Sequence, residues 1–455
     1  MMLKQSKQTL SYGMLAGFAY LLSSSSAYAA GFALRNQSAS GTGVALSSDT
    51  VNISDASGMF SNPAVMSEFE GHHLSLNLNY TAANISAKDA TLSSTELGGP
   101  HPVQGSAAVD DVSEPIIIPS LFGVHQINED IHVGWSVAIP WATNTEYSQD
   151  WAGRYHGINT ELVTTELTIN GSYRINEMFN VGLGINIQQA TGKFNSAVDL
   201  GLIGFSQGAT GQETIGRLDA ISEFEGDSIA YGFQFGVFAK PRENLRVGFN
   251  YRSEVVHEAE GDMTFTGTNA QASQLLAGFA QDARFRNSTD AKLKLTLPAV
   301  YSLGVAYDLD AFTVYGNLTH TGWSSFSEFT PEYNGARSRT LLDWNDSLFV
   351  AVGGEYRLDD ALTLRVGLAQ DQGVTEDRKR TPRTPDNDRL IAAIGAGYKL
   401  NEMISFNAAY QKLFIEETTI ELSDQDYPDA QTRGNLSAKL EIDPHIFVVS
   451  ADLAF

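Results

Sequence analysis

The chain has 455 residues and a formal net charge of -24, which excludes unaided binding of nucleic acids and other polyanions. It contains no Cys, which excludes disulfides and thiol catalysis. After the N-terminus no long apolar run could form a membrane-spanning helix. By contrast, 24 Phe, 17 Tyr and 41 Gly combined with alternating polarity are typical of a transmembrane β-barrel.

Residues 1–29 have the pattern of a secretory signal peptide. Lys4 and Lys7 precede an apolar stretch over 10–22, and Ala27-Tyr28-Ala29 is a small-x-small cleavage site. The alternative, a membrane anchor, requires a longer apolar stretch. We therefore expect the mature chain to begin at Ala30.

Residues 30–71 are rich in small residues and interrupted by Gly, so they cannot form a core of their own. They nevertheless carry helix signals: Asn62 is a good N-cap, and Pro63 fits the first helical position. Ser54-Asp55 starts a similar short turn. The stretch predicts a small helical plug, or hatch, inside a container formed by residues 72–455.

From His72 onward, polarity alternates with the period of a β-strand. The predicted strands are 72–83, 115–127, 131–141, 161–175, 179–194, 228–240, 245–263, 290–308, 312–332, 347–357, 362–374, 389–399, 404–420 and 434–455. Short turns alternate with long polar loops, as in outer-membrane barrels. We therefore expect an all-β fold, a fourteen-stranded antiparallel transmembrane barrel with both chain ends at the periplasmic side. A soluble sandwich would not need this alternation.

The alternation within strands also predicts which side chains face the lumen. Lipid tolerates charge poorly, so charged residues in 246–254, 290–297 and 434–443 are expected inside, with apolar residues outside. These inward residues are Arg246, Arg252, Glu254, Lys292, Lys294, Lys439 and Glu441. The final strand is apolar and ends in Phe455, which is typical of chains inserted into the Gram-negative outer membrane.

Several blocks occur in the order found in one known family. They are Ala30-Gly31-Phe32, Asn62-Pro63-Ala64, Tyr251-Arg252-Ser253-Glu254, Thr321-Gly322-Trp323-Ser324 and Pro385-Asp386-Asn387-Asp388-Arg389. With the strand plan, they make the chain resemble the FadL-type family of outer-membrane long-chain fatty-acid and hydrocarbon transporters. The resemblance implies a barrel closed by its N-terminal hatch, with Asn62, Pro63 and Ala64 in the gate. It also implies an apolar ligand path that leaves sideways through a kinked third strand.

Pro140 interrupts the predicted third strand, 131–141. Proline lacks the N–H that a β-ladder needs, so it belongs at a bulge, an edge or a break. One interpretation is that the strand ends at Ile139. The other is that the wall opens beside Pro140, with Ile139 and Trp141 flanking the gap.

Two long loops are more apolar than exposed loops should be. Loop 195–227 carries Leu200, Leu202 and Phe205, and loop 264–289 carries Leu275, Leu276 and Phe279, which share a helical face. The two loops could bury these residues against each other, or the residues could form an exposed groove that captures a hydrophobic ligand. Both interpretations can hold together.

By resemblance, Phe32 and Leu34 line an apolar pocket. Where the fatty-acid transporters of the family have basic wall residues for the ligand carboxylate, we align Ser196 and Asn345. Inward basic residues (Arg252, Lys292, Arg357 and Arg365) are expected to pair with inward acids (Glu254, Glu355 and Asp371). We therefore expect recognition to be mainly apolar.

These features predict a passive importer of long-chain fatty acids or similar hydrophobic molecules across the outer membrane, with no cofactor and no bound metal. The expected partners are the hydrophobic ligand, outer-membrane lipid and lipopolysaccharide, and the barrel-assembly machinery, and the chain is expected to be a monomer. Alternatives are a channel for hydrocarbons or aromatic compounds, a general porin, an enzyme using His73 and Ser75, and a surface adhesin or phage receptor. Calcium binding by Asp424-Gln425-Asp426 is also open.

Overall fold

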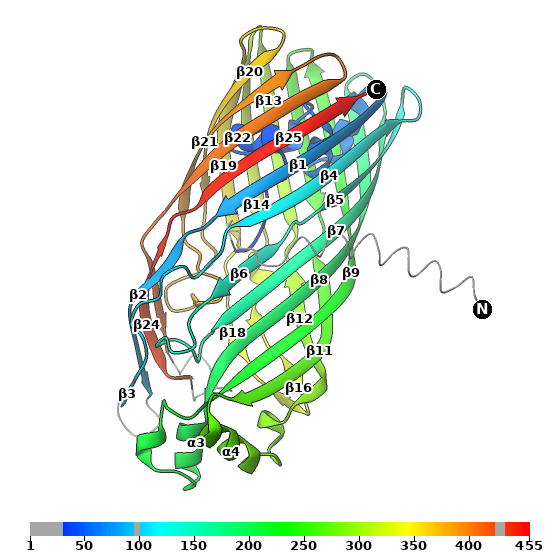
Figure 1. Cartoon of the computed structure of the whole chain (residues 1–455). Helices are drawn as coiled ribbons and strands as arrows, with labels where there is room; N and C mark the ends of the chain where they lie inside the picture. Colours follow the sequence, from blue (N-terminus) through cyan, green and yellow to red (C-terminus); the bar gives the residue numbers. More distant parts are fainter. Residues whose placement is uncertain (1–30, 95–100, 424–432) are drawn as a thin grey trace, which may run out of the picture.

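The computed structural model describes residues 31–94, 101–423 and 433–455, and it forms a closed barrel of fourteen antiparallel staves (Figure 1). We call each element that runs along the wall a stave, and a stave consists either of a single strand or of two strands that follow one another in line. In chain order the staves are β1 (His72–Ala82), β4 (Ile116–Gln126), β5 (Ile131–Ala138) with β6 (Ala142–Glu146), β7 (Asn159–Arg174), β8 (Phe179–Asp199), β9 (Asp219–Arg242), β10 (Leu245–Arg252) with β11 (Val255–Gly267), β12 (Ser288–Leu297) with β13 (Val300–Leu309), β14 (Phe312–Thr321), β19 (Ser347–Arg357), β20 (Leu362–Asp371), β21 (Arg389–Lys399), β22 (Ile404–Ile415) and β25 (His445–Ala454). Pairing of β1 with β25 closes the ring.

The number of staves agrees with the sequence prediction, but several predicted strands were too long. The stave predicted as 312–332 ends at Thr321, and that predicted as 404–420 ends at Ile415. The stretch 434–455 is broken at Asp443 and Pro444, and the predicted loop 84–114 contains strands. The additional strands, β2 (Ile85–Ser94), β3 (His101–Val103), β23 (Thr418–Leu422) and β24 (Asn435–Ile442), form a separate four-stranded sheet at the long-loop end. The predicted signal peptide, 1–29, and the acidic loop at 424–426 lie outside the described residues.

Four of the short turns share one local device. Asn128, Asn176, Asp359 and Asn401 each accept hydrogen bonds from the backbone N–H groups two and three residues further on. Such Asx turns reverse the chain within a few residues. They place the short connections at the same barrel end as the C-terminus, opposite α3 and α4 (Figure 1).

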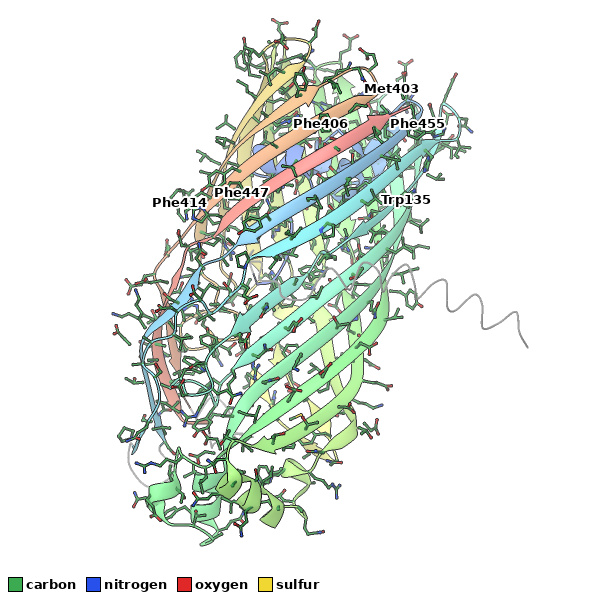
Figure 2. The ribbon with its side chains drawn as sticks, in the orientation of Figure 1. Trp135, Met403, Phe406, Phe414, Phe447 and Phe455 are labelled. Atoms are coloured by element: carbon green, nitrogen blue, oxygen red, sulfur yellow. The ribbon has the colours of Figure 1, made fainter. Side chains whose placement is uncertain are left out.

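A band of apolar side chains covers the outer face. Figure 2 shows Phe406 and Met403 near the short-turn end and Phe414 and Phe447 further along the wall. Phe406 and Phe414 are 45% and 53% exposed. Eight residues of strand span about 27 Å, so with the usual tilt these aromatics mark the two edges of a membrane-spanning band about 20–25 Å tall.

Beyond that band the outer face of the wall is polar and the inner face is apolar. The prediction that charged side chains face the lumen was wrong there. In β10, Arg246 and Arg252 are buried in the lumen as expected. In β12, however, Leu293 and Leu295 are buried while Lys292 and Lys294 are exposed. Lys439, Glu441 and Glu254 are exposed as well. These segments rise above the lipid, so their outer face meets water and their inner face packs against apolar loops.

Residues 31–71 lie inside the barrel as short helical turns (Figure 1). These are α2 (Ala39–Gly43), η1 (Asp49–Val51), η2 (Ala56–Phe60) and η3 (Pro63–Glu68). Asn62 caps η3, whose first residue is Pro63, and Asp55 caps η2, as the sequence indicated. We call residues 31–71 the plug.

The remaining short elements lie at the long-loop end. They are α3 (Leu200–Ser206), η4 (Gln212–Thr214), α4 (Ala270–Gly278), η5 (Ala283–Phe285), η6 (Trp323–Ser325), and the short strands β15 (Glu328–Phe329), β16 (Glu332–Tyr333), β17 (Ala336–Arg337) and β18 (Thr340–Leu341). Within the described part of the chain, no helix has the length and apolar character needed to cross a membrane.

Candidate functional site

The wall of the barrel is interrupted beside Pro140. Pairing of β4 with β5 stops at Leu121 and Val137, and the five residues of β4 beyond Leu121 (116–120) pair with β1 but with neither β5 nor β6. Pairing of the third stave with β7 stops at Ala138 and resumes at Ala142. Residues 139–141 stand there opposite two residues of β7, Thr164 and Thr165, so the stave has one extra residue. The result is a gap in the hydrogen-bond ladder between β4 and β6.

The start of the plug closes this gap from inside. Ala33 forms an antiparallel bridge with Trp141. The Leu34 N–H donates to the carbonyl of Pro140 at 2.8 Å, and the Ala142 N–H donates to that of Phe32 at 3.1 Å. The plug therefore supplies backbone partners that a neighbouring strand would otherwise provide. This pairing joins residues more than a hundred positions apart, so no local signal could have predicted it.

Side chains fill the rest of the gap. Leu34 packs with Ile116, Ile118 and Ile139 in one buried apolar cluster. The Gln37 amide Nε2 donates to the Ile139 carbonyl at 2.8 Å. Leu34 and Ile139 thus lie together at the interruption, whereas Ile116, Ile118 and Gln37 were not singled out from the sequence.

Phe32 lies in an aromatic cluster next to the gap. Its ring centroid is 4.9 Å from that of Trp323, 5.4 Å from Phe326, 5.9 Å from Trp344 and 6.1 Å from Trp141. All five rings are buried. Edge-to-face pairs of this kind add about 0.5–1.5 kcal/mol each beyond burial. The structure therefore brings Phe32 and Trp141 together in an apolar compartment.

The first described residue of the plug, Gly31, is held by a carboxylate that belongs to a buried ion pair. The Gly31 N–H donates to the Asp386 carboxylate at 3.3 Å, and this carboxylate is paired with Arg389. Burial raises the pKa of Asp386, while Arg389 opposes that shift. Asp386 and Arg389 belong to the block 385–389 that the sequence analysis singled out, but their contact with the plug was not anticipated.

The external helices cover the other end of the apolar compartment. Leu200 and Leu202 of α3 are buried, and Phe205 is half-buried. Leu275 and Leu276 of α4 are half-buried against the same cluster as Phe32, and Phe279 is buried in it. The helices also contact each other. Their apolar faces thus bury mutually and continue into the core above the plug.

A small cavity lies behind Pro140, between the plug and the wall. Its volume is about 70 Å³, and its apolar side is formed by Leu34, Pro140 and Trp141. Its polar side includes Arg35, Asp49, Arg252, Ser302 and Thr321. A cavity needs roughly 10–15 Å³ of such space to hold one water molecule, so this one has room for a small polar group. Binding a long chain requires the side chains around it to move.

The block Asn62-Pro63-Ala64, which the resemblance assigned to the gate, fixes the other end of the plug to the wall. The Asn62 side chain donates to the carbonyls of Thr50 and Val237 at 2.8 and 3.0 Å and accepts from the Ala64 N–H. Gly236 of β9 permits this close approach, because a Cβ there would overlap Asn62 and Pro63. Asn62, Pro63 and Ala64 thus join the plug to the barrel and do not themselves line the cavity, although the preceding Ser61 does.

The residues considered for carboxylate binding or catalysis are placed elsewhere. Ser196 bonds to Ser222, and Asn345 donates through its backbone to Val374, and neither lines the cavity. The Ser75 hydroxyl accepts from the Ala56 N–H, and His73 contacts the Glu70 carbonyl rather than Ser75.

The expected internal ion pairs are partly present. Arg252 pairs with Glu166, and Arg365 pairs with Glu355. Lys292 was expected inside but pairs on the outer surface with Glu260, which is also exposed. The lumen therefore holds compensated charge within the membrane band, while the compartment above is apolar.

These features define a class: a plugged transmembrane barrel whose wall has a lateral gap closed from inside. A family model described as "Outer membrane protein transport protein (OMPP1/FadL/TodX)" matches residues 20–455, and the chain belongs to this family. It is a multi-pass β-barrel of the outer membrane.

Comparisons with individual proteins support this family assignment. The chain is 27% identical to "Outer membrane protein P1" of Haemophilus influenzae over 421 residues, covering 87% of this chain and 88% of the relative. It is 27% identical to a "Long-chain fatty acid transport protein" of Escherichia coli over 415 residues, covering 88% and 91%. The crystal structure of a Pseudomonas aeruginosa FadL homologue superposes with a TM-score of 0.86 at 25% identity, covering 94% of this chain and all of that one.

Proposed function

We propose that the protein carries long-chain fatty acids or similar hydrophobic molecules passively across the outer membrane and releases them sideways into the bilayer. One observation carries the proposal: the ladder between β4 and β6 is interrupted, and residues of the plug rather than a strand close the gap. A relative of similar length bears the name long-chain fatty acid transport protein.

The path has three parts. The apolar faces of α3 and α4 capture the ligand at the long-loop end, where Leu275 and Leu276 remain half-exposed. The aromatic compartment around Phe32 then receives the chain, with Leu34 and Trp141 beside it. Displacement of the segment around Leu34 opens the gap beside Pro140, and the ligand enters the lipid.

Hydrophobic transfer favours this route. Each CH₂ kept out of water is worth about 0.8 kcal/mol, so a long chain gains nothing by entering the aqueous periplasm when the bilayer is adjacent. The straight route past the plug is also poorly suited. The crevice between plug and wall at the short-turn end is lined by Asp55, Arg365 and Asp452.

The alternative functions require different structural features. A general porin needs an open aqueous lumen, whereas the plug occupies this one. An uptake channel for hydrocarbons or aromatic compounds uses the same apolar compartment and differs in the ligand. An enzyme needs a reactive pair, and the Ser75 and His73 side chains contact backbone groups of other residues.

The test is uptake in a Gram-negative host that lacks its own long-chain fatty-acid transporter. Expression of the chain is expected to raise uptake of labelled oleate at least tenfold and to restore growth on oleate, with no increase in uptake of a polar sugar. Labelled toluene and hexadecane form parallel arms. Uptake of toluene or hexadecane without oleate would favour the hydrocarbon channel. No increase for any ligand, with the barrel folded in the outer membrane, would contradict the proposal.

A further inference from the structure

We propose that the barrel wall has a second lateral opening, between β9 and the stave of β10 and β11. Through it an uncharged long-chain molecule dissolved in the outer leaflet enters the apolar compartment around Phe32. The inference rests on the proposed function and adds an entrance for ligands that are already in lipid. Capture by α3 and α4 serves ligands that arrive from water.

The hydrogen-bond ladder between these two staves is interrupted. β10 pairs with β9 as far as Arg252, and the pairing resumes in β11 at Glu260. Between these points residues 253–259 stand opposite residues 228–233 without a strand pairing in the described part of the chain, and the stave of β10 and β11 has one residue more. On its other side β9 pairs with β8 without a break. The interruption therefore lies in one seam of the wall, as the interruption beside Pro140 does.

Side-chain hydrogen bonds replace part of the ladder in this seam. The Ser228 hydroxyl lies 2.8 Å from Nδ1 of His257. The Ser253 N–H donates to the Phe233 carbonyl at 2.9 Å, and the Ser253 hydroxyl accepts from the Phe233 N–H at 2.9 Å. A regular antiparallel ladder joins facing residues by pairs of backbone bonds at every second position. Fewer bonds therefore have to break in this seam than in a regular part of the wall.

Both faces of the seam are apolar. Inside, Val255 is buried in the same cluster as Phe32, and so is Ala230. Val255 packs against the bare backbone of Gly232, because a Cβ at Gly232 would lie 2.8 Å from its Cγ2. Outside, three large side chains of β9 are exposed, namely Ile229, Tyr231 and Phe233. Displacing Val255 would therefore connect lipid directly with the apolar compartment.

The charge of the seam's outer face selects the ligand class. Glu254 and Glu258 are exposed there, beside the apolar side chains of β9. Lys294 of β12 stands opposite Glu258, so the net charge of these three side chains is negative. Neither 228–233 nor 253–259 contains Lys or Arg. Like charges repel each other, so the seam disfavours a ligand carboxylate and tolerates an uncharged end such as a hydroxyl.

A buried row of polar side chains holds His257 in place and leads to the gap beside Pro140. Nε2 of His257 lies 2.8 Å from Oε1 of Gln188, and Nε2 of Gln188 donates to the Glu166 carboxylate at 2.9 Å. Glu166 stands opposite Ala138, the last paired residue of β5 before Pro140. Both interruptions border the same apolar cluster. A ligand that enters through the second opening is therefore already in the compartment that the first one releases.

The experiment locks the seam reversibly with Gly232→Cys combined with Ser253→Cys. The chain has no other Cys, and a Cβ at Gly232 lies 3.1 Å from the Ser253 hydroxyl oxygen. Such proximity suits a disulfide, whose Cβ atoms are about 3.5–4.5 Å apart. A Val255 methyl group has to shift to admit the new Cβ, so both single variants are controls. The host lacks its own long-chain transporter, and the label that reaches the inner membrane is measured with and without reductant. The ligands are labelled hexadecanol and labelled oleate presented on albumin.

A second pair of variants loosens the seam instead of locking it. His257→Ala removes the bridge to Ser228. His320→Ala is the matched control, because it changes an exposed histidine on β14. Surface amount and heat-modifiability of every variant are checked by blot.

Oxidation of the double variant is expected to lower hexadecanol transfer at least fivefold, with recovery on reduction, and to change oleate transfer less than twofold. His257→Ala should raise hexadecanol transfer at least twofold, and His320→Ala should leave it unchanged. Equal hexadecanol transfer in both redox states, with the disulfide formed, would overturn the second opening. Equal loss of both ligands would overturn the selective entrance, since the seam would then belong to a shared route. If the double variant does not insert, equal transfer by the two histidine variants overturns the inference. Absence of transfer of either ligand by the unchanged protein would contradict the proposed function itself.

Discussion

Replacing Ile139-Pro140-Trp141 by the two residues Val-Thr is expected to reduce oleate uptake at least tenfold while the barrel still inserts. The third stave has one residue more than β7 between Ala138 and Ala142. Removing one residue and the proline restores the register with β7, so the third stave can run on without a kink and pair with residues 116–120 of β4. A continuous ladder facing lipid opens at a high cost, since unpaired backbone groups there cost several kcal/mol each. Surface amount by blot and uptake of labelled oleate measure the effect.

Two controls separate sealing from other effects of the replacement. Trp141→Val removes the ring from the aromatic cluster but keeps the extra residue, so uptake should fall less than in the sealed variant. Pro140→Ala also keeps the extra residue and is expected to retain at least half of the uptake. Full uptake by a well-inserted sealed variant would mean that the ligand passes straight through the plug.

Deleting residues 30–64 is expected to convert the closed barrel into one that conducts small ions and polar solutes continuously. The deletion removes α2, η1 and η2 and the gate residues from the lumen. A barrel of this size has an interior wider than its own wall side chains fill, and polar lumen residues such as Arg246 and Asn250 would then face water. Single-channel conductance and cell sensitivity to a bulky polar antibiotic measure the leak.

A single substitution tests the same attachment of the plug to the wall without a deletion. A side chain at Gly236 would overlap Asn62 and Pro63, so Gly236→Val should displace this end of the plug and cause intermittent openings. Gly171→Val is the matched control, because a Cβ at Gly171 meets nothing within 4 Å. A deletion variant as closed as the parent would refute the plug's role, as would equal behaviour of the two glycine variants.

The barrel could be predicted from the sequence because its signals are local. Strand alternation and the Asn- and Asp-initiated turns act over a few residues, and they give the number and order of the staves. The error lay in assuming that every strand faces lipid. Lys292 and Lys439 point outward because their strands continue into water, and the alternation of polarity is the same whichever face is apolar. Only the position along the barrel axis decides between the two.

The candidate site was predictable in part. The chemistry of proline indicated either a strand end or an opening at Pro140, and the family resemblance favoured the opening and implied that Phe32 and Leu34 line a pocket. Three features depend on residue pairs that are distant in the sequence. They are the bridge between Ala33 and Trp141, the hydrogen bond from Gly31 to Asp386, and the position of Arg35. No propensity or periodicity specifies such contacts, because they arise when the plug is enclosed by the wall.

A reversible lock on the gap is the most direct test of lateral release. The chain has no Cys, so Ala33→Cys combined with Trp141→Cys introduces a single pair. Directly opposed residues of antiparallel strands have Cα atoms about 4.5–5.5 Å apart, within the disulfide range of about 4.4–6.8 Å, and these two residues form such a bridge. Oleate uptake is measured before and after reduction, with both single variants as controls. Lateral release predicts background uptake in the oxidised double variant, recovery on reduction, and uptake by each single variant that reduction does not change. Equal uptake in the oxidised and reduced states would contradict it.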